Sequence, residues 1–291
     1  MVLFTQNKDL QMKTGEELYT ACECKDCNIL FQYPFWNPEE THRFYETNYY
    51  AHTENAVIPR SIKLLDFYLR NRFSARLSFF LRNKLFPFYP GILKSKTVLD
   101  IGCGKGLFLD LMKKYNKTTY GLEPSVQASE IASKKGHKMI DKSLFYSAQK
   151  EIKFDLITMF QVAEHLSVKE ILEENIFSKM YHSLEAGGQL VIETPNYECD
   201  YAKEYKSNWR ALEMPRHLVI FSPKSLSKIL TDIGFKVKVH TRVSPIDVRE
   251  SFKLKFRENT FKNKMLKLAE LAKIAFFQKR NSSLLTVEAQ K

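Results

Sequence analysis

Short apolar stretches alternate with helix-type patterns through the second half of the chain. Runs of about five apolar residues indicate buried strands, and apolar residues spaced three or four apart indicate helices between them. The predicted strands are 97–101, 118–122, 138–140, 154–160, 189–193, 235–241 and 284–289. The predicted helices are 107–115, 125–135, 169–184 and 223–233. This alternation predicts a doubly wound α/β fold, with a mainly parallel sheet of about seven strands covered on both faces.

Three segments do not follow this alternation. Residues 1–56 form a small N-terminal appendage that contains cysteines and many aromatic residues. Residues 57–95 carry a broad apolar face at helical spacing, which predicts a basic amphipathic helical segment. The α/β domain then occupies 96–291, with a basic helical insert at about 244–281.

Positive charge is concentrated in two of these segments. The net charge is +12; residues 60–96 contain nine Lys and Arg against one acid, and residues 242–280 contain eleven against four. Such a local excess attracts an anionic substrate, an acidic lipid surface or nucleic acid. Solvated faces of ordinary amphipathic helices explain the same pattern, and both interpretations stay open.

Cysteine usage and hydropathy indicate a cytoplasmic protein. The five cysteines are an odd set, and three of them lie within residues 22–27, which suits a reducing compartment better than a disulfide framework. The first residues are charged and lack the apolar core of a signal peptide. No apolar run reaches the roughly 18 residues that a transmembrane helix needs. We therefore expect neither a signal peptide nor a membrane-spanning helix.

The most specific local pattern is an apolar strand that runs into a turn with three glycines. Gly102, Gly104 and Gly106 let the backbone turn sharply and let a ligand approach it closely. Their spacing is G-x-G-x-G, whereas dinucleotide-binding domains use G-x-G-x-x-G. Asp100 stands directly before the turn. Its negative charge would repel a pyrophosphate but suits the cationic end of a sulfonium amino acid.

A second carboxylate follows the next predicted strand. Glu123 lies about 20 residues past the glycines, where a carboxylate can accept hydrogen bonds from both hydroxyls of a ribose. An acid at a strand end also occurs simply as the neighbour of a helix N-cap. Together with the glycine turn, Glu123 favours the binding of a sulfonium nucleoside.

Four motifs, VLDIGCGKG, GLEPS, FDLITMFQVAEHL and LEAGGQLVIETPN, occur in this order. They resemble successive motifs of class I S-adenosylmethionine-dependent methyltransferases, in the group of ubiquinone-biosynthesis O-methyltransferases and bacterial surface-sugar methyltransferases. The resemblance covers about 96–241 and resumes at 282–291. It implies a Rossmann-like methyltransferase fold and S-adenosyl-L-methionine as cofactor. The residues that it places at the cofactor are Asp100, Gly102, Gly104, Gly106, Glu123, Pro124, Phe160 and Gln161.

Two histidines are candidates for the general base. His165 follows the fourth strand, and an imidazole with a pKa near 6.5 suits the deprotonation of a hydroxyl; the alternative is structural support of its loop. His217 lies in a stretch similar to one that faces the substrate in relatives; the alternative is a packed histidine at a helix entry. Glu164, Arg216 and Trp209 complete the predicted substrate-binding set, with Arg216 suited to a phosphate or carboxylate.

The cysteine-rich appendage resembles an incomplete zinc ribbon. Cys22, Cys24 and Cys27 offer three thiolates, whereas structural zinc normally takes four ligands. The resemblance implies two pairs of cysteines, of which this chain has only Cys24 and Cys27. We therefore predict no metal, with zinc at these three cysteines as the weaker alternative.

We predict a methyltransferase that O-methylates a sugar or a lipid-linked, anionic small molecule, with its basic helices on an anionic, inner membrane surface. One alternative is a nucleic-acid (RNA) methyltransferase, which the lack of an N/D-P-P-Y/F motif after the fourth strand disfavours. Another is a non-catalytic cofactor-binding module, which the intact glycines and Glu123 disfavour. The sequence does not identify the individual acceptor molecule, the methylated atom or the oligomeric state.

Overall fold

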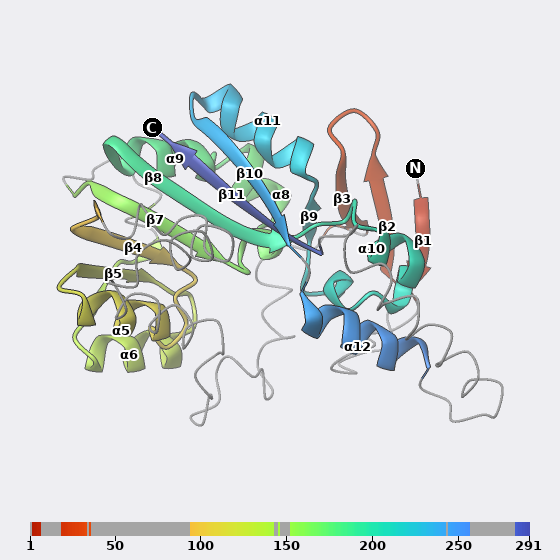
Figure 1. Cartoon of the computed structure of the whole chain (residues 1–291), viewed down its shortest axis with the longest axis horizontal. Helices are drawn as coiled ribbons and strands as arrows, with labels where there is room; N and C mark the ends of the chain where they lie inside the picture. The colour runs from red at the N-terminus through yellow and green to blue at the C-terminus, as the bar shows by residue number, and fades with distance from the viewer. Residues whose placement is uncertain are drawn as a thin grey trace, which may run out of the picture.

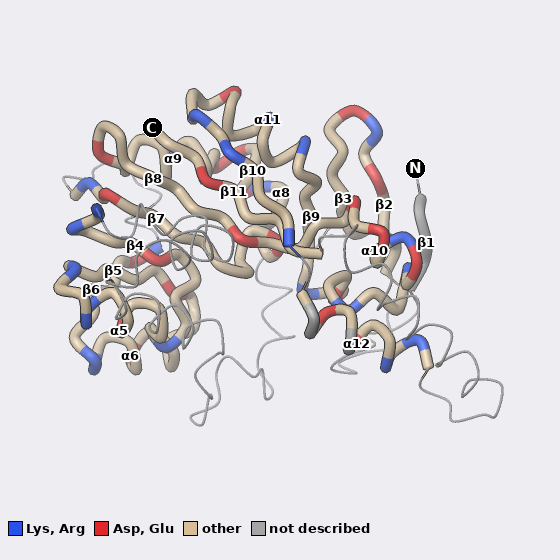
Figure 2. The backbone as a smooth tube through the Cα atoms, viewed as in Figure 1, with Lys and Arg blue, Asp and Glu red and all other residues tan. Residues whose placement is uncertain are grey.

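The computed structural model describes residues 2–6, 19–33, 35, 94–142, 145, 152–242, 244–256 and 283–291. The predicted helical segment at 57–93 and the insert beyond residue 256 lie outside these described residues. In the described helices, no segment is long and apolar enough to cross a membrane. Figure 2 shows the described Lys and Arg dispersed among Asp and Glu.

A seven-stranded sheet forms the centre of the α/β domain (Figure 1), in the order β10-β11-β8-β7-β4-β5-β6. The strands are β4 (Thr97–Ile101), β5 (Thr118–Leu122), β6 (Lys138–Met139), β7 (Phe154–Phe160), β8 (Leu184–Pro195), β10 (Lys236–Arg242) and β11 (Leu284–Gln290). The ladders from β6 to β8 are parallel, and β11 is antiparallel to both of its neighbours. The predicted doubly wound, mainly parallel sheet is confirmed.

Helices cover both faces of this sheet. They are α5 (Leu107–Lys114), α6 (Val126–Lys134), α8 (Val168–Leu172), α9 (Ile176–Ser183) and α11 (Pro223–Ile233). In the neighbouring strands β4 and β7, Leu99 and Ile157 belong to a core with α9 and α11. Val98 and Leu156 belong to a second core with α5. Successive residues of one strand point to opposite faces, which explains the near-continuous apolar strands in the sequence.

The single helix predicted at 169–184 is wrong. The structure has two short helices there, α8 and α9, separated by Asn175 with φ +52°. A left-handed residue ends the helical ladder although the apolar spacing continues through it. Ser167 and Glu170 form a capping box that starts α8, and β8 begins at Leu184, five residues before the predicted 189.

A second, four-stranded antiparallel sheet joins the N-terminal appendage to the α/β domain. Its order is β1-β2-β3-β9, with strands β1 (Val2–Gln6), β2 (Tyr19–Cys24), β3 (Ile29–Tyr33) and β9 (Val219–Phe221). Leu30 pairs with Ile220 across β3 and β9. Both side chains belong to a core that includes residues from α10 (Asp200–Tyr205) and Val248 of α12 (Pro245–Lys255). The described part of the appendage therefore shares a sheet and a core with residues 197–221.

Candidate active site

The turn after β4 is shaped by glycines in the left-handed region. Gly102, Gly104 and Gly106 have φ of +70°, +52° and +75°. A Cβ on Gly102 would lie 2.3 Å from Val162 Cγ2, and one on Gly106 would lie 2.7 Å from His137 Cδ2. No atom of the described chain lies within 4 Å of a Cβ built on Gly104. The turn is thus packed at both ends and open at its centre, where a ligand can approach the backbone.

Two carboxylates flank this open centre. Asp100 is buried and accepts a hydrogen bond of 2.7 Å from Thr158 Oγ1. Burial raises the pKa of Asp100 to about 7, and the nearby charge of Glu123 adds to this rise. Glu123 accepts hydrogen bonds from the backbone N–H of Gly104 at 2.8 Å and of Ser125 at 2.9 Å. Two acids and a glycine backbone therefore meet at the carboxyl ends of β4 and β5, which fits a cationic nucleoside.

The other predicted cofactor residues lie along the same edge of the sheet. Phe160 ends β7 and packs edge-on against Phe108, with ring centroids 5.1 Å apart. Gln161 follows with φ +56°, and its side chain is exposed. Pro124 is exposed directly before Ser125, the N-cap of α6.

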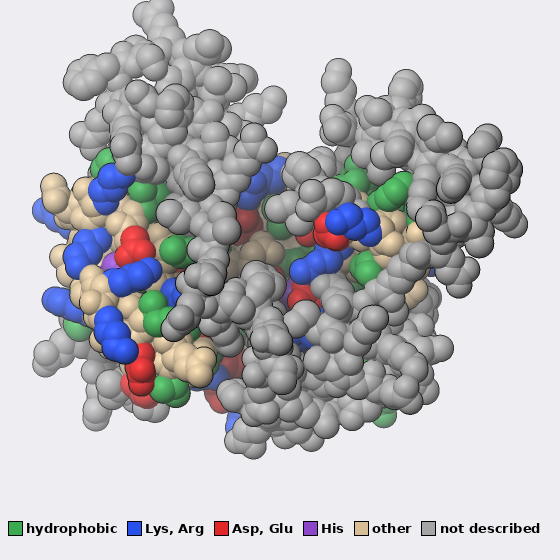
Figure 3. Space-filling model, turned by 90° about the horizontal axis from the view of Figure 1, so that it is seen from below, with side chains coloured by type: hydrophobic (Ala, Val, Ile, Leu, Met, Phe, Trp, Pro, Cys, Tyr) green, Lys and Arg blue, Asp and Glu red, His purple; other side chains and the backbone are tan. Residues whose placement is uncertain are grey.

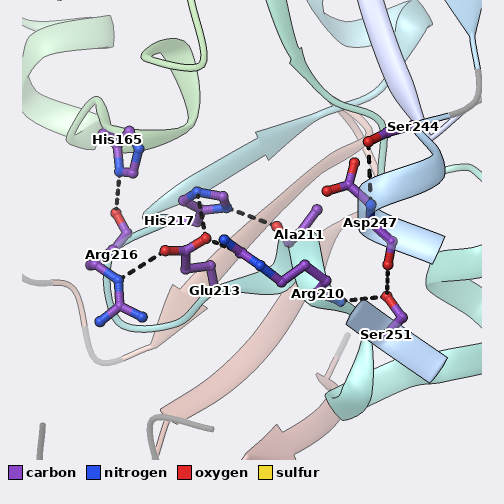
Figure 4. Close-up of polar contacts among 9 residues, drawn as sticks. All are labelled: His165, Arg210, Ala211, Glu213, Arg216, His217, Ser244, Asp247 and Ser251. Atoms are coloured by element: carbon purple, nitrogen blue, oxygen red, sulfur yellow. Dashed lines mark hydrogen bonds and ion pairs between the residues drawn. The ribbon is translucent and has the colours of Figure 1, made fainter. Parts of the chain in front are cut away.

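His165 and His217 are 52 positions apart in the chain but lie in contact (Figure 4). Their rings meet edge to face, with centroids 4.7 Å apart. His165 Nδ1 lies 2.9 Å from the carbonyl of Arg216, and His217 Nδ1 lies 2.7 Å from the carbonyl of Ala211. A carbonyl only accepts, so each Nδ1 carries the proton and each neutral ring keeps its lone pair on Nε2. Burial lowers both pKa values, that of His217 to about 3.

Glu213 is a buried carboxylate that sequence reasoning missed. It accepts a hydrogen bond of 3.1 Å from Arg216 Nε, pairs with Arg210 and lies 3.8 Å from His217 Nε2 (Figure 4). Burial alone would raise its pKa, but positive charges from His217 when protonated, Arg210 and Arg216 lower it to about 2. The signal in the sequence is the spacing, because Arg210, Arg216 and His217 stand three or four positions from Glu213.

The remaining predicted substrate residues differ in their surroundings. Glu164 is fully buried; its Oε2 accepts a hydrogen bond of 2.9 Å from Thr194 Oγ1, while Oε1 has no hydrogen-bond partner among the described residues. Burial raises the pKa of Glu164 to about 8. Arg216 is fully buried beside Glu213. Trp209 lies in the core shared with β2 and β3, and its indole N–H has no hydrogen-bond partner in the part of the chain that the structure describes.

One group of residues in the described ranges brings three candidate metal ligands together. Ligand atoms of Glu164, His165 and His217 all lie within 4.8 Å of one another. Within the same ranges, the three N-terminal cysteines form no such group. Cys24 ends β2 and Cys27 lies in the turn before β3. A hydrogen bond from Cys27 lowers the pKa of Cys24, and burial raises that of Cys27 to about 11.

The cofactor residues and the histidine pair lie on neighbouring segments that are joined by backbone contacts. Leu218 N donates to the carbonyl of Glu164 at 2.8 Å, which ties the loop after β7 to the strand that follows His217. Figure 3 shows Lys, Arg, Asp and Glu side chains among the described residues on this face of the molecule.

The family model described as "Methyltransferase domain" matches residues 68–240, more than half of the chain. The chain therefore belongs to this methyltransferase family, and its domain uses S-adenosyl-L-methionine as cofactor. A solved structure, a SAM-dependent methyltransferase from Archaeoglobus fulgidus, shares the fold with a TM-score of 0.50 at 18% identity. That match covers 77% of this chain and 99% of the other.

Two curated relatives are similar in sequence to part of this chain. The mitochondrial ubiquinone biosynthesis O-methyltransferase of Candida albicans is 29% identical over 140 residues, which are 44% of this chain and 39% of that protein. The ubiquinone biosynthesis O-methyltransferase of Bradyrhizobium sp. (strain ORS 278) is 26% identical over 152 residues, 48% of this chain and 58% of that protein. The matches thus span about half of the relatives' length.

Proposed function

We propose that this chain transfers the methyl group of S-adenosylmethionine to a hydroxyl of a small molecule, with His165 as the general base. The observation that carries the proposal is the contact between His165 and His217 beside the cofactor edge, with each Nδ1–H bound to a carbonyl. In the reaction the acceptor oxygen attacks the methyl carbon and the C–S bond breaks. Its electron pair returns to sulfur, and the hydroxyl proton passes to His165 Nε2.

Their degree of burial separates the two histidines. His165 is half-buried, while His217 is only 6% exposed and has its pKa lowered to about 3. A base with so low a pKa takes a proton poorly near neutral pH. His165 therefore has the better access and basicity, and His217 packs against its ring and orients it.

The cofactor fits the edge formed by β4, β5 and β7. In the proposed complex Asp100 faces the cationic methionine part of the cofactor. Glu123 accepts hydrogen bonds from the ribose hydroxyls, which replace its present hydrogen bonds from backbone N–H groups. The three glycines lie along the methionine part. Phe160, Gln161 and Pro124 line the rest of this edge.

The names of the two curated relatives support a hydroxyl acceptor, because both are O-methyltransferases of ubiquinone biosynthesis. The net charge of +12 supports an anionic acceptor, such as a sugar phosphate or a lipid-linked intermediate at an inner membrane surface. Arg216 is bound to Glu213, which supports a role in holding this segment. Glu164 Oε1 and Trp209 Nε1 have no hydrogen-bond partner among the described residues. We keep Glu164 as a substrate contact because it directly precedes His165, whereas Trp209 is enclosed in the core shared with the N-terminal sheet.

A divalent cation is a second candidate for activating the hydroxyl. Glu164, His165 and His217 combine a carboxylate with two imidazoles whose Nδ1–H groups donate to carbonyls. Metal-binding histidines are commonly held by such a second hydrogen bond. A cation held there would lower the pKa of the acceptor hydroxyl.

A methyl-transfer assay tests these proposals. The purified chain is incubated with S-adenosylmethionine and, separately, a polyprenyl catechol, a nucleotide sugar or tRNA, and formation of S-adenosylhomocysteine is followed. Turnover of either small molecule that is lost in His165→Gln but kept in His182→Gln supports the proposal; His182 is an exposed histidine of α9. Turnover of tRNA alone would contradict it. Loss on treatment with EDTA, restored by Mn²⁺ or Zn²⁺, would favour the metal route.

A further inference from the structure

A polar cluster that contributes no proposed ligand lies against the glycine turn. Lys135 Nζ, just after α6, donates 2.7 Å hydrogen bonds to the carbonyl of Lys105 and to Asp110 Oδ2. Asp110 Oδ1 lies 3.0 Å from His137 Nε2, and His137 Nδ1 lies 2.9 Å from Thr119 Oγ1. We call Lys135, Asp110 and His137 the Lys135 cluster. It connects the middle of the turn, the first turn of α5, β5 and the segment after α6.

The glycine turn needs an external support of this kind. Glycines lose more conformational freedom on ordering than other residues, so a turn with three of them is costly to hold in one shape. Glu123 holds Gly104 N at 2.8 Å, but the same carboxylate is proposed to receive the ribose. The hydrogen bond from Lys135 reaches the carbonyl of Lys105, the residue between Gly104 and Gly106, and it uses no group that is assigned to the cofactor.

The buried ring of His137 fixes the position of Asp110 in this cluster. The side chain of His137 is fully buried, and a Cβ on Gly106 would lie 2.7 Å from its ring. His137 therefore packs against the end of the turn while it fixes Asp110. Asp110 in turn neutralises Lys135 and directs its ammonium to the carbonyl, and a charge-assisted hydrogen bond is stronger than a neutral one.

We propose that Lys135, oriented by Asp110 and His137, is a positioning residue that holds the glycine turn in its cofactor-binding shape before the cofactor arrives. The proposal rests on the cofactor site proposed above. A ligand that binds an already ordered turn does not spend binding free energy on ordering it, so the support from Lys135 should lower the Kd of the cofactor. The affinities for S-adenosylmethionine and S-adenosylhomocysteine should rise by the same factor, since Lys135 acts on the backbone of the turn and not on the sulfonium charge.

Calorimetric titration with S-adenosylhomocysteine tests the proposal on the full chain. Lys135→Met is expected to raise the Kd about tenfold, the size of a lost hydrogen bond to a charged group. Lys135→Arg keeps a cationic donor and should recover most of the affinity. The matched control is Lys134→Met, because Lys134 is the preceding residue, is 79% exposed and makes only a long, exposed ion pair of 3.9 Å with Glu130 among the described residues. This control should bind within about twofold of the wild type.

Two further measurements separate positioning from general stability. Lys135→Met should raise the KM for S-adenosylmethionine while kcat, the acceptor KM and the melting temperature stay near those of Lys134→Met. Asp110→Asn should also raise the Kd for S-adenosylhomocysteine, by a smaller factor. The double variant of Lys135→Met and Asp110→Asn should raise the Kd by less than the product of the two single factors, because both residues belong to one hydrogen-bonded cluster.

Several outcomes would overturn the proposal. Unchanged affinity for S-adenosylhomocysteine in Lys135→Met overturns this inference and leaves the proposed cofactor site intact. The same holds if Lys134→Met loses as much affinity as Lys135→Met, or if the affinity of Lys135→Met falls only together with its melting temperature. A folded wild type that takes up no S-adenosylhomocysteine overturns the proposed cofactor site and this inference with it.

Discussion

His165 and His217 pack edge to face with ring centroids 4.7 Å apart, and each donates its Nδ1–H to a backbone carbonyl. This arrangement fixes the orientation of both rings and leaves a lone pair on each Nε2 in the neutral form. The pair forms between the loop after β7 and the segment before β9. In the proposed function, this pair supplies a neutral base next to the edge of the sheet that holds the cofactor residues.

Replacement of the proposed base should affect turnover and leave cofactor binding intact. We expect His165→Gln to lower kcat about 100-fold or more, the usual contribution of a general base. The Kd for S-adenosylhomocysteine should stay unchanged, because the proposed function places His165 at the acceptor and not at the cofactor. Steady-state kinetics and calorimetry on His165→Gln and His182→Gln check this. An equal loss of turnover in both variants would argue against a base at residue 165.

The pH profile of turnover should follow the protonation of His165. Burial lowers its pKa below the ordinary value near 6.5. The base works when neutral, so kcat should be at its plateau at neutral pH and fall only as the pH drops below 6.5. The profile is measured with saturating cofactor and acceptor. A limb that falls between pH 7 and 8 would contradict His165 as the base.

Asp100 should make the preference for the cationic cofactor depend on pH. Burial raises the pKa of Asp100 to about 7 in the cofactor-free chain. The sulfonium of S-adenosylmethionine favours the ionised carboxylate, whereas S-adenosylhomocysteine carries no such charge. The Kd ratio of the two ligands should therefore favour S-adenosylmethionine above pH 7 and lose this preference as the pH falls. If the Kd ratio of the two ligands does not change with pH, and is the same in the wild type and in Asp100→Asn, this role of Asp100 is excluded.

Two glycine substitutions should separate packing from ligand contact. Gly102→Ala places a Cβ 2.3 Å from Val162, so it should lower the melting temperature. Gly104→Ala meets no atom of the described chain within 4 Å, and its positive φ costs about 1–2 kcal/mol. It should mainly weaken S-adenosylhomocysteine binding, because the Cβ projects into the open centre of the turn. Calorimetry and thermal unfolding distinguish the two, and full affinity in Gly104→Ala would place the cofactor elsewhere.

The buried carboxylate of Glu213 should contribute to stability. Glu213→Gln removes one carboxylate that pairs with both Arg210 and Arg216, and breaking such a buried pair costs about 3–5 kcal/mol. The pKa of Glu213 is lowered to about 2, so its contribution should be complete above about pH 4.3 and be lost as the pH falls towards 2. Urea unfolding at pH 7 and pH 3 measures both effects. The exposed Asp232, paired with Lys228, gives the control Asp232→Asn, and an equal effect there would contradict this account.

Local patterns in the sequence predicted the α/β sheet well. The strand 154–160 and the helix 223–233 have the predicted bounds, because each combines a clear apolar period with a definite end. The break at Asn175 escaped prediction, since its left-handed conformation does not disturb the apolar spacing around it. The ladder between β3 and β9 also escaped, because it joins short strands nearly 200 positions apart.

The candidate site was predictable only where its residues are close in sequence. Asp100 and the glycines form one continuous motif, whose spacing alone indicates a ligand. The contact of His165 with His217 depends on tertiary structure, through the bond from Leu218 N to the carbonyl of Glu164. Glu213 was missed because a carboxylate between basic residues is also typical of a solvated turn.

Direct titration of the cofactor-free chain with S-adenosylhomocysteine tests the central claim, that Asp100, the glycine turn and Glu123 hold the cofactor. The account predicts uptake of one equivalent. It also predicts about tenfold weaker binding in Glu123→Gln, the cost of hydrogen bonds lost to a charged group, and unchanged binding in Glu130→Gln, an exposed acid of α6. A folded chain that takes up neither S-adenosylhomocysteine nor S-adenosylmethionine would contradict it.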